Sequence, residues 1–239
     1  MVKWYHESFP SSNCGFDSRY PLAMDVADDM TPEVIMLGGA SGTGKSAIAR
    51  IIAREFDAGC RLATDVIRQV LRGAMRDNPT SVIHAESFNI PESDGSLAEQ
   101  VNLSGFESQA QLVMAGVADA LHHSAKEHWR SVVEGVHVIP GKHVGDFPVV
   151  EVLIVTMDEA AHQRNLALRD HSSGGGRPLQ HYLDNFTRIR AVQQFLVEQA
   201  RASNVPIVDT SAGSLEDAVL SVAQHVRDRW PTEGQHDTP

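Results

Sequence analysis

The chain has 239 residues, of which 42% are apolar and 21% are charged, a balance typical of a single globular domain with a sizeable core. Its formal net charge of -11 excludes a general attraction to nucleic acid or to an anionic membrane surface. The sequence contains two cysteines, no apolar stretch long enough to cross a bilayer and no signal-peptide pattern at its start, so we expect a cytoplasmic protein.

The two ends of the chain show neither helical nor strand periodicity. Residues 1–30 mix proline, serine, glycine and acidic residues, which predicts an irregular N-terminal extension. Residues 231–239 are polar and predict a frayed tail. The regular domain is therefore expected over residues 31–230.

Within that domain, short apolar runs alternate with longer stretches that have helical periodicity. The runs predicted as buried strands are 34–37, 61–64, 131–135, 149–155 and 205–209. Helices are predicted over 41–56, 65–75, 105–128, 179–202 and 215–230. This alternation is typical of an α/β fold, a parallel five-stranded sheet flanked by helices.

Two segments interrupt the alternation. Residues 77–104 are polar and contain proline and glycine, and a loop of that length in a compact domain is usually a functional lid or disordered. Residues 171–177, HSSGGGR, form a glycine-rich hinge between two helical stretches. We therefore predict a small lid over about residues 164–190.

The first strand runs directly into a phosphate-binding motif. Residues 39–46, GASGTGKS, fit the P-loop pattern G-x-x-x-x-G-K-[ST] and open an apolar-periodic helix. In such a loop, backbone amides and the helix N-terminus hold phosphate oxygens, a lysine reaches the β- and γ-phosphates, and a serine hydroxyl binds Mg²⁺. The residues that the pattern assigns to nucleotide binding are Gly39, Ala40, Ser41, Gly42, Thr43, Gly44, Lys45 and Ser46.

Other motifs narrow the kind of P-loop protein. The D-x-x-G and N-K-x-D sequences of GTPase switches are absent, and the paired acids of AAA-type machines do not follow the third apolar run. That run, SVVEG, ends in Glu134, which is placed to support Mg²⁺ through water or to orient an acceptor. An ordinary acid at a strand end is the alternative.

A carboxylate and two arginines follow the second predicted strand. Asp65, Arg68 and Arg72 have the spacing that puts side chains on one helix face, toward the crevice at the carboxyl edge of the sheet. A carboxylate there can accept the proton of an acceptor hydroxyl, and the arginines can bind an acceptor anion. Asp65 as a simple helix cap paired with Arg68 is the alternative.

Arginines also gather around the glycine hinge, where a lid can neutralise the charge of a transferring phosphoryl group. They are Arg164, Arg169, Arg177, Arg188 and Arg190. Arg169 and Arg177 flank the glycines and are predicted to be catalytic, and Arg190 is predicted to bind substrate. Solvated helix faces are the alternative for some of the five.

With these motifs in place, the chain resembles the P-loop 2-phosphoglycerate kinases, an archaeal-type family. The resemblance spans residues 33–210 and includes, beyond the P-loop, TDVIRQVLR, SVIHAES, VVEGVHVIPG and RPLQHYLDNFTRIRAVQQFL. It implies an adenylate-kinase-like core that uses ATP and Mg²⁺ to phosphorylate 2-phosphoglycerate, giving 2,3-diphosphoglycerate. The kinase domain alone is matched, because residues 1–30 do not resemble the N-terminal regulatory domain of the archaeal enzymes.

The resemblance also implies further acceptor-site residues. His137 lies in the EGVHV block, His84 in the HAES block and Gln109 in the GFESQ block, and each is expected near the acceptor. His137 as a buried, satisfied histidine is an equal alternative. The expected partner is a small anionic substrate, with no nucleic acid or membrane partner and no assigned oligomeric state. Acceptors such as 3-phosphoglycerate, gluconate or shikimate, and a non-catalytic ATP-binding regulator, remain open.

Overall fold

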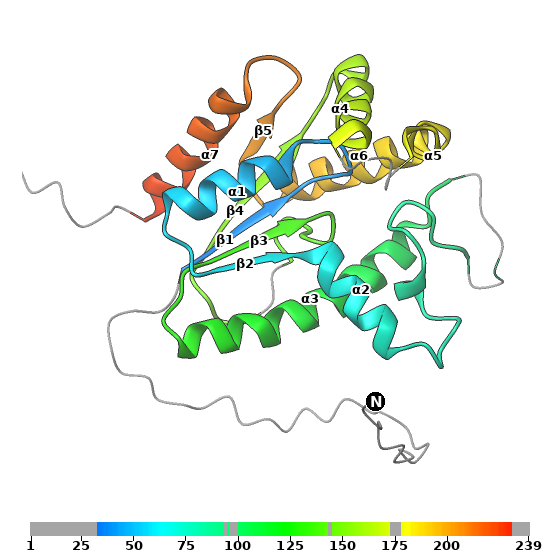
Figure 1. Ribbon diagram of the computed structural model, residues 1–239, viewed down its shortest axis with the longest axis horizontal. Coiled ribbons are helices and arrows are strands. Elements are labelled where there is room, and N and C mark those ends of the chain that lie inside the picture. The colour runs from blue at the N-terminus through cyan, green and yellow to red at the C-terminus, as the bar shows by residue number, and fades with distance from the viewer. Residues whose placement is uncertain (1–32, 93–94, 96–99, 143–144, 173–177, 231–239) are drawn as a thin grey trace, which may run out of the picture.

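The computed structural model describes residues 33–92, 95, 100–142, 145–172 and 178–230, with the backbone alone described for 169–172. Its centre is a five-stranded sheet in the order β2-β3-β1-β4-β5, and all four strand pairs are parallel (Figure 1). The strands are β1 (Val34–Gly38), β2 (Cys60–Ala63), β3 (Ser131–Gly135), β4 (Val149–Val155) and β5 (Ile207–Asp209). The predicted parallel sheet is confirmed, and every predicted apolar run overlaps one of its strands.

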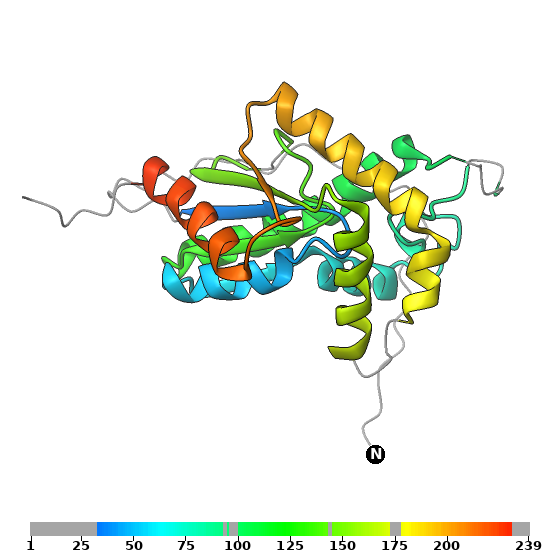
Figure 2. The same ribbon diagram turned by 90° about the horizontal axis from the view of Figure 1, so that it is seen from above.

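Helices cover both faces of this sheet. On one face, α1 (Lys45–Glu55) and α7 (Leu215–Arg229) pack against Ile35 and Leu37 of β1 and their neighbours. On the other face, α3 (Leu103–Lys126) and α6 (Phe186–Ala202) pack against Met36 and Leu153 (Figures 1 and 2). Successive residues of a strand point to opposite faces of the sheet, and helices cover both faces. Because side chains on either face are buried, the strand sequences show no regular alternation of apolar and polar residues.

The strand order brings the ends of β1 and β3 together. Gly38 is paired with Gly135 across the two strands, so the loops that follow them start side by side. The start of α2 (Thr64–Ala74) packs directly on this point, because a Cβ on Gly135 would lie 1.8 Å from Thr64 Oγ1. The P-loop, the end of β3 and the start of α2 therefore meet at one edge of the sheet.

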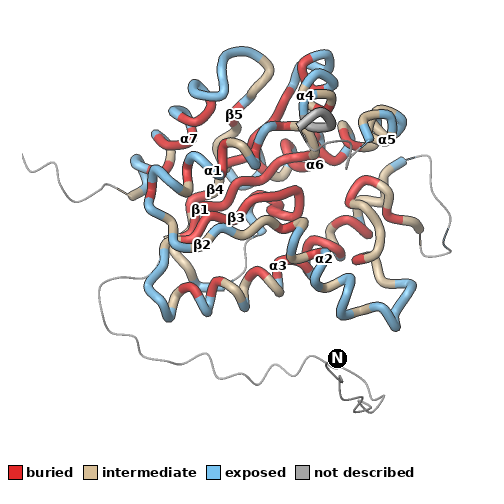
Figure 3. Tube along the Cα trace, viewed as in Figure 1, coloured by how far each residue is buried: buried red, intermediate tan, exposed pale blue. Residues whose placement is uncertain are grey.

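The segment after α2 is not the lid or disordered loop that its polarity predicts. It contains the short 3-10 helix η1 (Val82–His84), and its residues Ile83, Phe88 and Ile90 are buried. Figure 3 shows how buried and exposed stretches alternate along the chain. Residues 81–92 therefore form a packed wall, and the expectation was wrong there because aperiodic apolar residues anchor the loop. Residues 93–94 and 96–99 lie outside the described chain.

The region of the predicted lid contains α4 (Glu159–Ser172), α5 (Leu179–Asp184) and the start of α6. The single helix predicted over 179–202 is two helices, interrupted at Asn185. The glycine hinge at 173–177, the extension at 1–30 and the tail at 231–239 lie outside the described residues. Within the described residues, no helix combines the length and apolarity needed to cross a membrane.

Candidate functional site

The P-loop connects β1 to α1 with the geometry that its glycines permit. Gly42 and Gly44 have φ of 89° and 83°, values that residues with a Cβ rarely adopt. The buried Lys45 folds back over the loop, and its Nζ donates to the Ala40 carbonyl at 3.1 Å. The loop thus encircles a space at the N-terminus of α1, where amides and a helix dipole favour an anion.

A hollow of about 750 Å³ opens over this loop, and we call it the P-loop hollow. Its floor is residues 42–48, and its walls come from α1, β2, α4 and the loop between β5 and α7. Leu168 of α4 and Leu215 of α7 line it and are unusually exposed for leucines, at 68% and 45%. A phosphate-binding loop with leucine side chains on two of the walls suits a ligand that has a phosphate end and an apolar end.

A hydroxyl and a carboxylate meet beside the P-loop. Ser46 Oγ donates to Glu134 Oε2 at 3.0 Å, and Glu134 is buried at the end of β3. Arg61 of β2 reaches the other carboxylate oxygen at 3.8 Å and also lines the P-loop hollow. The two residues predicted to hold Mg²⁺ are therefore neighbours, and their donor atoms are oxygens, which Mg²⁺ prefers.

A second hollow, of about 390 Å³, lies over the start of α2, and we call it the α2 hollow. Asp65 and Arg68 line it from α2, and residues 86–88 and α5 form the opposite walls. Glu86 and His181 are in contact on these walls, with His181 Nε2 2.7 Å from Glu86 Oε2. The structure thus brings Asp65 and Arg68 together in one hollow.

The two hollows adjoin at consecutive residues of the P-loop. Ser41 lines the α2 hollow and Gly42 lines the P-loop hollow. The P-loop therefore borders both hollows.

A buried polar network lies behind the α2 hollow. His137 Nδ1 is 2.9 Å from Thr64 Oγ1, and His137 Nε2 is 3.1 Å from Gln109 Oε1. Gln109 Nε2 in turn donates to the carbonyls of Val82 and Ala85 at 2.6 and 3.0 Å. The side chains of Gln109 and His137 are therefore satisfied within the protein, and neither lines the hollow.

Burial lowers the pKa of His137 to about 4; Asp65 opposes this shift, whereas Arg68 and Lys45 add to it. His137 is consequently neutral near pH 7, which corresponds to the alternative of a satisfied buried histidine. Arg68 also holds residues 83–85 against α2, because its Nη1 donates to Ala85 O at 2.9 Å and to Ile83 O at 3.3 Å.

Two further predicted acceptor residues, His84 and Arg72, do not line either hollow. His84 Nε2 lies 2.9 Å from Asn78 O and 3.1 Å from Met75 O, within the loop after α2. Arg72 is exposed in the last turn of α2, one turn beyond Arg68. Neither side chain lines the α2 hollow.

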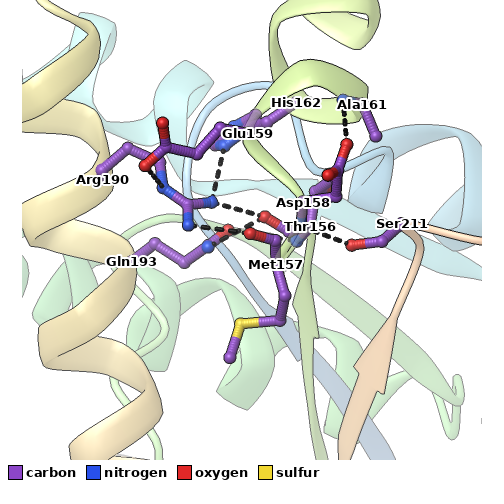
Figure 4. Close-up of polar contacts among 9 residues, drawn as sticks. All are labelled: Thr156, Met157, Asp158, Glu159, Ala161, His162, Arg190, Gln193 and Ser211. Carbon is purple, nitrogen blue, oxygen red and sulfur yellow. Dashed lines mark hydrogen bonds and ion pairs between the residues drawn. The ribbon is translucent and has the colours of Figure 1, made fainter.

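The three hinge arginines whose side chains the structure describes lie in different surroundings. Arg190 Nη1 donates to Thr156 O at 2.6 Å and Nη2 to Met157 O at 2.9 Å, so it binds the end of β4 (Figure 4). Arg188 Nε donates to Phe88 O at 2.8 Å, and Arg164 is exposed. The side chain of Arg169 and the whole of Arg177 lie outside the described residues.

The sequence motifs missed several residues that line the two hollows or contact the P-loop. Arg61, Glu86 and His181 line the hollows, and His162 contacts the P-loop carbonyl of Ser41 at 2.7 Å. Glu86 and His181 stand in the SVIHAES and RPLQHYLDNFTRIRAVQQFL blocks, but nothing in those blocks singles them out, and Arg61 and His162 stand in no block; all four are placed by contacts distant in sequence.

Comparison with known proteins confirms the resemblance inferred from the motifs. The zeta toxin family matches residues 22–138. A 2-phosphoglycerate kinase of Pyrococcus horikoshii is 29% identical over 198 residues, which cover 82% of this chain and 64% of that protein. One of Methanopyrus kandleri is 27% identical over 213 residues, with 87% of this chain and 64% of that protein covered. The chain thus spans 64% of the length of these two curated relatives.

Among solved structures, the chain is similar to a shikimate kinase from Acinetobacter baumannii in complex with shikimate, with 14% identity and a TM-score of 0.47. That likeness covers 84% of this chain and 95% of the other. A gluconokinase from Sinorhizobium meliloti gives 15% identity, a TM-score of 0.46, and coverage of 84% and 94%. Likenesses this distant say nothing of what the chain acts on.

Proposed function

We propose that this chain is an ATP-dependent kinase that transfers the γ-phosphate to a hydroxyl of a small phosphorylated acid, with 2-phosphoglycerate as the first candidate. The observation that carries the proposal is the meeting of the two hollows at Ser41 and Gly42. A P-loop that only sensed or hydrolysed a nucleotide would not need a second hollow beside it for an acceptor. The 2-phosphoglycerate kinases among the relatives supply the candidate acceptor and product, 2,3-diphosphoglycerate.

ATP would lie in the P-loop hollow. The amides of residues 42–46 and the Lys45 ammonium would hold its phosphates, and the leucine-lined walls suit its base. Gly39 is required for the close passage of the loop over the sheet, because a Cβ there would lie 2.4 Å from Ile154 O.

The oxygen atoms of Ser46 and Glu134 fit Mg²⁺, with the hydroxyl as a direct ligand and the carboxylate as support. A bound Mg²⁺ would neutralise part of the phosphate charge as the β–γ bond breaks. Arg61, which reaches the same carboxylate, would keep Glu134 in place.

Asp65 would orient the acceptor in the α2 hollow. The acceptor hydroxyl oxygen forms a bond to the γ-phosphorus while the bond to the bridging oxygen of ADP breaks. The hydroxyl proton passes to the Asp65 carboxylate, and Arg68 faces the acceptor anion. Lys45 balances charge on the transferred group from the P-loop side.

The proposed kinase domain also includes the predicted lid. We assign the kinase domain to residues 31–230 and a lid to about 164–190, in which Arg169 and Arg177 contact the transferring group. The placement of Arg190 favours a bracing role at the end of β4 over substrate binding.

The charge of the α2 hollow favours a second candidate acceptor. Its described lining includes two carboxylates, Asp65 and Glu86, against Arg68 and His181. Two carboxylates against the single guanidinium of Arg68 suit an acid with one anionic group, such as a sugar acid, better than one with a carboxylate and a phosphate. Assays with acceptors of both classes therefore distinguish the two candidates.

The experiment is ADP release from Mg-ATP with 2-phosphoglycerate, 3-phosphoglycerate, glycerate, gluconate and shikimate, followed by phosphorus NMR of active mixtures. We expect turnover with 2-phosphoglycerate and a diphosphorylated product. Lys45→Ala should abolish it, whereas Lys142→Ala, which removes an exposed lysine paired with Glu107, should not. Activity with a singly charged acid alone would retain the kinase and replace the acceptor. ATP binding without any acceptor-dependent turnover would overturn the proposal in favour of a regulator.

A further inference from the structure

The imidazole of His162 connects α4 to the P-loop. His162 is fully buried, with 0% exposure, and its Nε2 lies 2.7 Å from the carbonyl oxygen of Ser41. Because a carbonyl oxygen only accepts hydrogen bonds, Nε2 carries the hydrogen and donates it. Nδ1 is then the unprotonated nitrogen, and it faces Arg190 Nη1 at 3.5 Å (Figure 4).

The surroundings fix this tautomer. Arg190 is held by two backbone carbonyls at the end of β4 and by Glu159 at 3.9 Å, so its guanidinium is locked beside the ring. Burial lowers the pKa of His162; the Ser41 carbonyl opposes this shift, and Arg190 and Lys45 reinforce it. The ring is therefore a neutral donor that points at the P-loop.

The same helix packs against the next residue of the loop. A Cβ on Gly42 would lie 2.7 Å from Leu166 Cδ2 and 3.0 Å from His162 Cδ2, so α4 is in direct contact with the loop. Two other residues of α4, Asn165 and Leu168, line the P-loop hollow.

The Ser41 carbonyl belongs to the same planar peptide unit as the amide of Gly42. In a trans peptide the C=O and N–H bonds point in opposite directions, and no cis bond occurs in the described chain. Holding the Ser41 oxygen toward α4 therefore turns the Gly42 N–H away from α4. Gly42 is also the first P-loop residue on the wall of the P-loop hollow.

We propose that His162 is a positioning residue of the nucleotide site, which orients the Ser41–Gly42 peptide so that the P-loop is held ready for phosphate. The inference rests on the proposed function, because it assigns a nucleotide to the P-loop hollow. It adds a residue outside the P-loop motif that sets nucleotide affinity without touching the nucleotide.

The test compares dissociation constants for Mg-ATP and Mg-ADP, measured by calorimetry, for wild type, His162→Gln, His162→Asn and His162→Leu. Glutamine can place a donor near the position of Nε2, whereas asparagine is one methylene shorter and leucine has no donor. Losing a donor to a buried carbonyl should weaken Mg-ATP binding about tenfold in the Asn and Leu variants, and the Gln variant should bind nearly as wild type. If the Leu variant does not fold, the difference in Mg-ATP affinity between the Asn and Gln variants tests the role of His162.

Phe186→Leu is the matched packing control, because the Phe186 ring lies 5.3 Å from the His162 ring and makes no contribution to the hydrogen bond. It should lower the thermal midpoint without a change in Mg-ATP affinity. Equal affinities in wild type and the Asn and Leu variants would overturn the role of His162. Failure of wild type to bind Mg-ATP would instead overturn the proposed function, so the two failures are distinguishable.

Discussion

Asp65 and Glu134 are the two carboxylates closest to the proposed chemistry, and their surroundings assign them different tasks. The N-cap of α2 is Ala63, whose side chain makes no capping bond, so Asp65 stands inside the first turn and is not the cap. Its carboxylate lines the α2 hollow, whereas Glu134 is buried against Ser46. The first is therefore placed for an acceptor and the second for a metal.

Asp65→Asn should separate chemistry from nucleotide binding. Without a carboxylate to accept the hydroxyl proton, kcat should fall by about 10²–10⁴-fold, and Mg-ATP affinity should not change. Steady-state kinetics and calorimetry measure the two effects. Asp119→Asn removes the same charge from an exposed site on α3 and is the control. Turnover at the wild-type rate would show that Asp65 is not the base.

Glu134→Gln should change the dependence on Mg²⁺. The amide keeps the shape of the side chain but loses the charge that supports the metal, so half-maximal activity should need about 10–100-fold more Mg²⁺. A titration of activity with Mg²⁺ after chelation with EDTA measures the shift. Glu107→Gln, at an exposed ion pair with Lys142, should titrate as wild type. An unchanged titration would remove Glu134 from the metal site.

At the scale of elements, the contact between β3 and α2 depends on one glycine. Gly135 has φ of 152°, and any Cβ there would collide with Thr64 Oγ1, the hydroxyl that also contacts His137. The end of β3 and the start of α2 are fixed relative to each other by this approach.

Gly135→Ala should therefore destabilise the fold by about 1–3 kcal/mol, through overpacking and an unfavourable backbone conformation. The matched control is Gly73→Ala in α2, where an added Cβ meets nothing within 4 Å. Because alanine has the higher helix propensity, that variant should be stabilised by up to about 1 kcal/mol. Urea unfolding of both variants measures the difference, and equal effects would contradict the packing described for Gly135.

The elements themselves were largely predictable, and the exceptions have physical causes. The central strands β1 and β4 are mostly apolar runs buried on both faces, a signal that needs no knowledge of tertiary contacts. Residues 81–92 were misread because Ile83, Phe88 and Ile90 have no regular spacing, although they are buried. The break at Asn185 carries no proline or glycine signal.

The candidate site was predictable where a local motif defines it. The P-loop and the pairing of Glu134 with Ser46 follow from sequence spacing and strand position. Arg190, His84 and Gln109 were expected at a substrate, but their side chains bind backbone carbonyls. Such partners are set by the tertiary fold, and a polar residue type alone does not reveal whether it meets a ligand or a carbonyl.

At the scale of the whole molecule, two neutral buried histidines make stability depend on pH. His137 has a pKa of about 4, whereas an unfolded histidine titrates near 6.5. Between these values the unfolded chain binds a proton that the folded chain does not, so stability is highest above about pH 6.5 and falls as the pH decreases. The lowered pKa of His162 acts in the same direction.

For His137 alone, the loss between pH 7 and pH 5 should be about 2 kcal/mol. Urea unfolding at the two pH values should show this loss in wild type, and His137→Gln should lose less despite lower stability at pH 7. His122→Gln, at an exposed site, should keep the wild-type dependence. Identical pH dependence in His137→Gln and wild type would show that His137 is not held neutral.

The direction of the chain through the sheet fixes where other molecules can be joined to this domain. All strands run the same way, and both hollows open beyond their carboxyl ends, while α7 runs back from β5 (Figure 2). Glu33, before β1, and Trp230, after α7, therefore lie at the opposite edge of the sheet. A fusion partner or surface tether joined at either position would leave both hollows facing solution, so immobilised protein attached there should remain open to both reactants of the proposed reaction.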